Sequence, residues 1–124
     1  MGTWRKAPPE LVELFSELIE ENPDLELRKM FGYPCAFVAA NNQMLTGVHQ
    51  ENVMLRMSEA DRAWAAEQGA TPFEPMPGRT MREYVVVPPE VVDSDDELRA
   101  WLERGLAYAE TLPLKVSKRR KKTE

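Results

Sequence analysis

Two apolar stripes with helical spacing stand at opposite ends of the chain, and only short strand-like segments lie between them. One stripe runs from Leu11 to Ile19 and the other from Leu98 to Leu112. The intervening connections are tight, as expected for antiparallel neighbours. The pattern therefore predicts an α+β single domain, with a mainly antiparallel sheet and an N-terminal, a short middle and a C-terminal helix. About five strands are expected, at residues 25–30, 35–40, 43–49, 53–57 and 84–87.

Local signals predict where the helices begin and end. Pro8 and Pro9 suit the first turn of a helix, because a missing N–H costs little there. Ser58 and Ser94 each precede an acidic residue by three positions, which is the pattern of a capping box. Gly69 is a natural residue after a helix end. The segment 71–78 is rich in proline and is expected to be a loop.

The central strands can be assigned faces if Asn41 and Asn42 form a two-residue hairpin turn. That register places residue 38 opposite residue 45. The next turn is expected at residues 50–51 or 51–52, and both positions put the same residues of the following strand on the same face of the sheet. One face, expected to be core, then carries Phe37, Thr46, Val48, Val53, Leu55 and Met57. The other face carries Ala36, Val38, Leu45, Gly47, His49, Met54 and Arg56.

Charge is distributed unevenly along the 124 residues. Among residues 1–114 acidic side chains outnumber basic ones by ten, whereas residues 115–124 are strongly basic. We therefore expect a domain at 1–114 and a disordered basic tail at 115–124. An acidic body repels nucleic acid, but the tail is a candidate nucleic-acid segment. Its cations are Lys115, Lys118, Arg119, Arg120, Lys121 and Lys122.

The sequence offers little for catalysis or metal binding. Cys35 and His49 are the single representatives of their types. In the register above they point to opposite faces of the sheet, which disfavours a nucleophilic pair. One His and one Cys cannot build a dedicated zinc site, so no metal or cofactor is expected. A lone cysteine, no apolar leader and no membrane-length apolar run favour a cytoplasmic protein.

The remaining candidates are cations on or near the face expected to point away from the core. His49 and Arg56 lie on that face, and two further guanidinium groups precede the buried strand near residue 84. Together they would form an anion- or partner-binding surface, although ion pairs with the abundant carboxylates are the more common use of such arginines. The candidates are His49, Arg56, Arg79, Arg82 and Tyr84.

Several motifs occur in a characteristic order along most of the chain. They are the run 28–32 (Arg-Lys-Met-Phe-Gly), Met44 and Gly47, the junction 56–59 (Arg-Met-Ser-Glu), the run 73–76 (Phe-Glu-Pro-Met) and Tyr84. From about Leu11 to about Leu112 the chain resembles the TfoX N-terminal domain family of bacterial competence regulators.

The resemblance implies a regulatory setting in which such proteins work with a cyclic-AMP receptor transcription factor. Full-length regulators are implied to carry a helical C-terminal domain, so we expect a stand-alone N-terminal-type domain here. The family offers no agreed catalytic residues. The expected function is a non-enzymatic regulatory or protein-interaction module. The alternatives are nucleic-acid association through the tail, and a small-anion binder or unrecognised enzyme using His49, Arg56, Arg79 and Tyr84.

Overall fold

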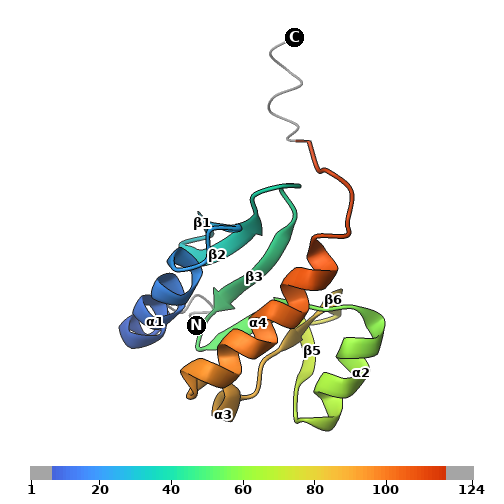
Figure 1. The fold of residues 1–124 in the computed structure, drawn as a ribbon. Coiled ribbons are helices and arrows are strands. Elements are labelled where there is room, and N and C mark those ends of the chain that lie inside the picture. Colours follow the sequence, from blue (N-terminus) through green and yellow to red (C-terminus); the bar gives the residue numbers. More distant parts are fainter. Residues whose placement is uncertain (1–6, 117–124) are drawn as a thin grey trace.

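A computed structural model describes residues 7–116, in which four helices pack against one six-stranded sheet (Figure 1). The α+β prediction is confirmed, with one strand more than the expected five. The helices are α1 (Pro9–Glu20), α2 (Glu59–Glu67), α3 (Pro89–Val92) and α4 (Asp95–Ala109). The strands are β1 (Leu25–Met30), β2 (Tyr33–Val38), β3 (Met44–His49), β4 (Asn52–Arg56), β5 (Thr71–Met76) and β6 (Arg79–Val86).

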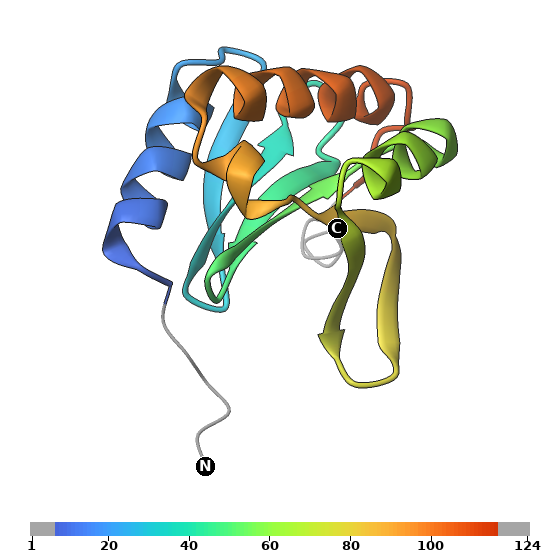
Figure 2. The same cartoon turned by 90° about the horizontal axis from the view of Figure 1, so that it is seen from below.

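The sheet has the strand order β1-β2-β3-β4-β6-β5, and every neighbouring pair is antiparallel. The helices cover one face of this sheet, and the β5–β6 hairpin extends away from them (Figure 2). We call the uncovered side the open face. Strand β6 lies between β4 and β5, with Val85 in the main core and Val86 against the open-face cluster. Strand β6 is therefore an interior strand, and its valines suit one because both faces of such a strand are buried.

The main core fills the space between the helices and the sheet. Its completely buried side chains include Phe15, Ile19, Leu45, Leu55, Met57 and Leu98. Helix α4 approaches the sheet closely at Gly105. A Cβ atom there would lie 2.6 Å from the carbonyl oxygen of Arg56 and 2.8 Å from a methyl carbon of Leu55. Only glycine allows the helix backbone this close to β4.

The predicted helix signals are confirmed. Pro9 occupies the first position of α1, and Gly69 has a φ of +106° after α2. The Ser58 hydroxyl accepts a hydrogen bond from the Asp61 N–H at 3.2 Å, and the Ser94 hydroxyl accepts one from the Glu97 N–H at 3.3 Å. Each serine thus satisfies an N–H that a helix start leaves unpaired.

The predicted register between β2 and β3 is wrong. The connection spans residues 39–43, with a positive φ at Asn42, rather than only the two asparagines. Phe37 pairs with Met44 but Ala36 pairs with Thr46, so Leu45 is an extra residue that forms a bulge. Residues assigned to β2 consequently change faces.

The correction affects four of the residues assigned above. Ala36, Val38 and Leu45 belong to the main core, and Phe37 lies outside it with the Arg28 guanidinium 4.1 Å from its ring centre. The remaining assignments to the core face, from Thr46 to Met57, are confirmed. The turn at residues 50–51 is also confirmed, because His49 pairs with Asn52.

Residues 71–76, expected to be a loop, form the edge strand β5. The prolines at 72 and 75 are tolerated because the strand pairs on one side only. Strand β6 begins at Arg79, five residues before the expected start. Together β5 and β6 make the hairpin that borders the open face.

Candidate functional site

The open face carries its own small apolar cluster, separate from the main core. Met54, Phe73 and Tyr84 are buried in it, and Met44 and Val86 pack against them. Beside the cluster is a cavity of about 180 Å³, which we call the sheet cavity. Its lining residues are Met30, Phe31, Tyr33, Pro34, Cys35, Met44, Val48, His49, Met54, Phe73, Pro75 and Met81.

A wider depression adjoins the sheet cavity and shares Phe31, Tyr33, His49, Pro75 and Met81 with it. We call it the outer hollow. It measures about 840 Å³ and is also lined by Gln50, Met76, Pro77, Arg79 and Thr80. Between them the two depressions are bordered by five of the seven methionines of the chain. The surface formed by the two depressions is therefore apolar and adaptable, because methionine side chains are flexible and polarizable.

Two glycine-containing features create this surface. At Gly47 a Cβ would lie 3.0 Å from the Met54 methyl carbon and 3.2 Å from the Cys35 Cβ, so any side chain would displace the sulfur-bearing side chains there. The turn between β1 and β2 has positive φ angles at Phe31 and Gly32, of 55° and 84°. That turn holds Phe31 at the rim with 80% of its surface exposed.

His49 lies between two aromatic rings at the boundary of the two depressions. The imidazole centre is 5.5 Å from that of Tyr33 and 5.3 Å from that of Phe73, with an edge-on contact to Phe73. Burial lowers the pKa of His49, and the Glu51 carboxylate only partly opposes this. The imidazole is therefore neutral at neutral pH.

Cys35 lies on the same face as His49, contrary to the predicted register. Cys35 pairs with Gly47, and both Cys35 and His49 line the sheet cavity. Burial nevertheless raises the pKa of the Cys35 thiol, which disfavours the thiolate that a nucleophile needs. The case against a Cys–His pair thus rests on the state of the thiol rather than on opposite faces.

Arg56 and Tyr84, two of the predicted binding residues, are joined to each other. The Arg56 Nε lies 2.7 Å from Glu83 Oε1, and its guanidinium carbon lies 5.6 Å from the Tyr84 ring centre. The carbonyl oxygen of Met44 accepts hydrogen bonds from both side chains, each at 3.2 Å. Tyr108 of α4 donates to Glu83 at 2.9 Å. Burial alone would raise the pKa of Glu83, but Arg56 and Tyr108 outweigh it and lower that pKa.

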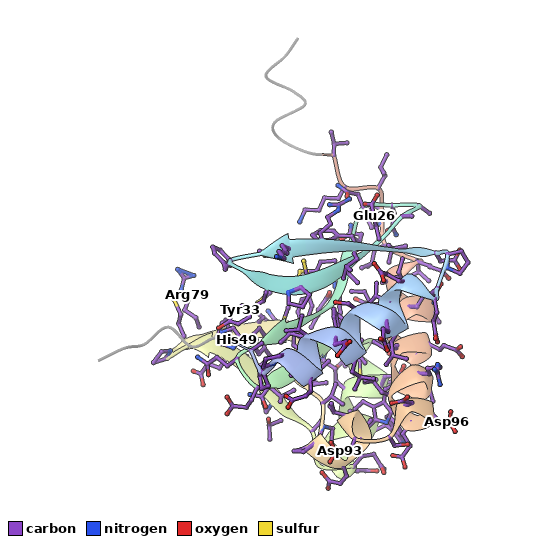
Figure 3. The ribbon with its side chains drawn as sticks, turned by 90° about the vertical axis from the view of Figure 1, so that its left-hand side faces the viewer. Glu26, Tyr33, His49, Arg79, Asp93 and Asp96 are labelled. Carbon is purple, nitrogen blue, oxygen red and sulfur yellow. The ribbon has the colours of Figure 1, made fainter. Side chains whose placement is uncertain are left out.

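Arg79 and Arg82 differ from Arg56. Within residues 7–116 neither guanidinium has an ion-pair or side-chain hydrogen-bond partner. Arg79 borders the outer hollow, whereas Arg82 borders a separate hollow of about 190 Å³ against α2. Figure 3 shows Tyr33 and His49 close together and Arg79 on the neighbouring hairpin, with Asp93 and Asp96 on the helical side. The five predicted residues therefore do not form one site: His49 and Arg79 border the outer hollow, Arg56 contacts Tyr84, and Tyr84 shares the hollow against α2 with Arg82.

The segment that leads to the basic tail is held against the turn between β2 and β3. Buried Asn41 donates hydrogen bonds to the carbonyl oxygens of Ala109 at 2.8 Å and Leu112 at 3.0 Å. The Lys115 N–H donates to the Asn41 carbonyl at 2.8 Å. Of the predicted tail cations only Lys115 falls within the described residues; Lys118, Arg119, Arg120, Lys121 and Lys122 lie outside them.

Two further searches of the described part of the chain give negative results. No group of three or more His, Cys, Asp or Glu side chains in residues 7–116 is arranged to hold a metal ion. None of the helices found there combines the length and apolar character needed to cross a membrane.

Comparison with protein families identifies the fold that presents this surface. The family model for the TfoX N-terminal domain matches residues 13–109, which is most of the chain. The protein belongs to the TfoX N-terminal domain family. No curated protein matches the sequence. Within this TfoX N-terminal domain, the matched residues include every lining residue of the sheet cavity and the outer hollow.

Sequence reasoning found His49 and Arg79 but missed the outer hollow, which both residues border, and the sheet cavity beside it. The expectation of a loop at 71–78 gives no reason to place Phe73 and Pro75 beside β3. The signal that was present is the repetition of Pro and Met in both halves of the 71–81 segment, which brings apolar side chains to a sheet edge.

Proposed function

We propose that this TfoX N-terminal domain is a protein-interaction module, and that its open face binds the partner. The observation that carries the proposal is the gathering of five methionines and Phe31 around the sheet cavity and outer hollow, on the face that the helices leave uncovered. The family's competence-regulator character supports a role in transcriptional control.

The exposure of these side chains supports binding rather than simple core packing. Phe31 is 80% exposed and Met76 is 53% exposed, whereas Met57 in the main core is completely buried. Large apolar side chains that stay exposed together commonly mark interaction surfaces. Methionine-rich surfaces in particular adapt to the shape of a partner.

The ionisable groups at the surface favour binding over catalysis. The Cys35 thiol has a raised pKa and the His49 imidazole a lowered one, so both are neutral at neutral pH. Arg56 is engaged by Glu83 and the Met44 carbonyl. The module therefore offers shape, apolar area and one free guanidinium, Arg79, to a partner.

A peptide-library selection tests the proposal. Random peptides would be selected on the full chain and then rebound to Met81→Glu, which places a carboxylate between the sheet cavity and the outer hollow. Leu114→Glu is the matched control, because Leu114 is also an exposed apolar residue, at 67%, but borders a different hollow. Thermal unfolding would confirm that both variants fold.

We expect selected peptides to lose at least tenfold in affinity for Met81→Glu and to bind Leu114→Glu as they bind the original chain. Equal binding to all three proteins would refute the open face as the binding site. The same would follow if no peptide were enriched.

A further inference from the structure

The sheet cavity has the size of a single aromatic ring. Its volume is about 180 Å³, and an apolar protein cavity of about 150 Å³ binds benzene. Met44 and Met54 both line it, and their methyl carbons lie next to Gly47, which has no side chain. Contacts between methionine sulfur and an aromatic ring are favourable. Shape and lining therefore both suit a ring inserted edge-first or face-first from the outer hollow.

The polar group nearest to that ring would be His49. The imidazole already makes edge-on and tilted contacts with Phe73 and Tyr33. A further aromatic group in the cavity would join this cluster, in which such pairs each contribute favourably beyond their buried area. Because burial keeps His49 neutral, an uncharged occupant meets no buried charge.

Charge indicates what lies beside the ring. Among residues 7–116, Arg79 is the only Asp, Glu, Lys or Arg that lines either the sheet cavity or the outer hollow. Its guanidinium has no ion-pair or hydrogen-bond partner among the described residues. An exposed, unpaired guanidinium next to an apolar cavity is suited to a carboxylate, with which it can form two parallel hydrogen bonds.

The strands and the helices differ in net charge. The strands carry five cations, Arg28, Lys29, Arg56, Arg79 and Arg82, against three anions, Glu26, Glu74 and Glu83. The helices carry 12 acidic side chains against three arginines, at 62, 99 and 104. An acidic partner is therefore repelled by the helices, whereas the charged side chain that it meets at the outer hollow is Arg79.

From these observations we infer that the sheet cavity is the anchor site for one aromatic side chain of a partner polypeptide. The residues that flank this anchor are acidic, and one of their carboxylates pairs with Arg79 in the outer hollow. This inference rests on the proposed function and names the chemistry of the partner.

Two other occupants fit the surface less well. A nucleic-acid strand is held mainly by many phosphate contacts, and Arg79 is the single cation at these depressions. A second copy of the chain would bring a whole acidic body against this one, since residues 1–114 carry ten more acidic than basic side chains, whereas a short segment brings only a few carboxylates close to Arg79. Both occupants remain distinguishable outcomes of the test below.

The test uses the full chain with ¹³C-labelled methionine methyl groups, observed by NMR. The probe is the blocked peptide acetyl-Glu-Asp-Phe-Asp-Glu-amide. One control peptide has alanine in place of phenylalanine, and a second has lysine in place of each acidic residue. We expect the probe to shift the methyl signals of Met44, Met54 and Met81 and to leave that of Met57, which is buried in the main core, unchanged.

Two arginine variants provide the matched comparison. Arg79→Glu is expected to weaken binding of the probe at least tenfold, and Arg82→Glu by less than twofold. The two residues lie three positions apart on β6 and both are exposed, but only Arg79 borders the outer hollow. Neither substitution touches the main core, so folding is not at issue.

The inference is overturned if the alanine control binds as well as the probe, if both arginine variants behave alike, or if the cavity methyl signals do not move. Cavity shifts caused by single-stranded RNA, or by raising the concentration of the protein alone, would instead assign the cavity to nucleic acid or to a second copy. Peptides from the library that depend on Met81 but lack aromatic residues would refute the anchor and leave the proposed function standing.

Discussion

Replacing Gly105 by alanine is the perturbation whose effect the structure defines most directly. The added Cβ would lie 2.6 Å from the Arg56 carbonyl oxygen and 2.8 Å from a methyl carbon of Leu55. A carbon and a carbonyl oxygen ordinarily approach to about 3.3 Å. Helix α4 would therefore have to move away from β4 by about 0.7 Å, because the first obstacle is backbone rather than a flexible side chain.

The cost of that movement can be compared with the gain in helix propensity. Overpacking a core costs roughly 1–3 kcal/mol, and a contact with backbone places this site near the upper end. Alanine in a helix interior is favoured over glycine by about 1 kcal/mol. The Gly105→Ala protein is thus expected to lose roughly 2 kcal/mol of stability. At an m value of about 1.5 kcal/mol/M the urea midpoint falls by about 1.3 M.

Urea unfolding followed by circular dichroism measures this shift. Ala107→Gly, at an exposed position of the same helix, calibrates the propensity contribution and is expected to cost about 1 kcal/mol. If Gly105→Ala were as stable as the original protein, or more stable, the close approach of α4 to β4 would be refuted.

Three further predictions follow from residues described above. Because burial lowers the pKa of His49 in the folded protein from 6.5, the unfolded chain binds more protons between the lowered value and 6.5. Stability should therefore be complete above about pH 6.5 and fall as the pH drops through this window, and urea midpoints of His49→Gln should lack that decline. Asn41→Ala should cost about 1–3 kcal/mol in urea unfolding, because the carbonyl groups of Ala109 and Leu112 lose their donor; an unchanged urea midpoint would contradict this. Nucleic-acid association through the tail predicts binding of labelled duplex DNA that falls steeply with salt and is lost in a 1–114 chain; equal binding by both lengths would exclude it.

The parts of the fold that depend on local chemistry could be predicted from the sequence. Helix starts at Pro9, Ser58 and Ser94 follow from side-chain and backbone properties of the residues at those positions. The interior position of β6 follows from its consecutive valines, because they point to both faces of the strand and need apolar neighbours on each. These features need no knowledge of distant segments.

The site depends on distant pairing, and there the prediction from sequence failed. Nothing in residues 43–46 shows that Leu45 takes no partner in β2, because the bulge is defined only by the pairing of β3 with β2. Likewise the prolines of β5 conceal an edge strand that is defined only by its pairing with β6. The methionine content was visible as an unusual feature, but its gathering on one face required the topology.

The bulge at Leu45 has a consequence for how this surface could change. Leu45 and Thr46 both belong to the buried side of β3, so the extra residue alone puts Cys35, Gly47 and Met54 in one cross-strand row. Deleting one residue there would restore regular alternation and turn the side chains of β2 or β3 to the opposite side. The surface can thus be erased by a change in strand length that alters none of the side chains that form it. Chain length between the turns of this hairpin is therefore as specific a marker of the cavity as the identity of any residue lining it.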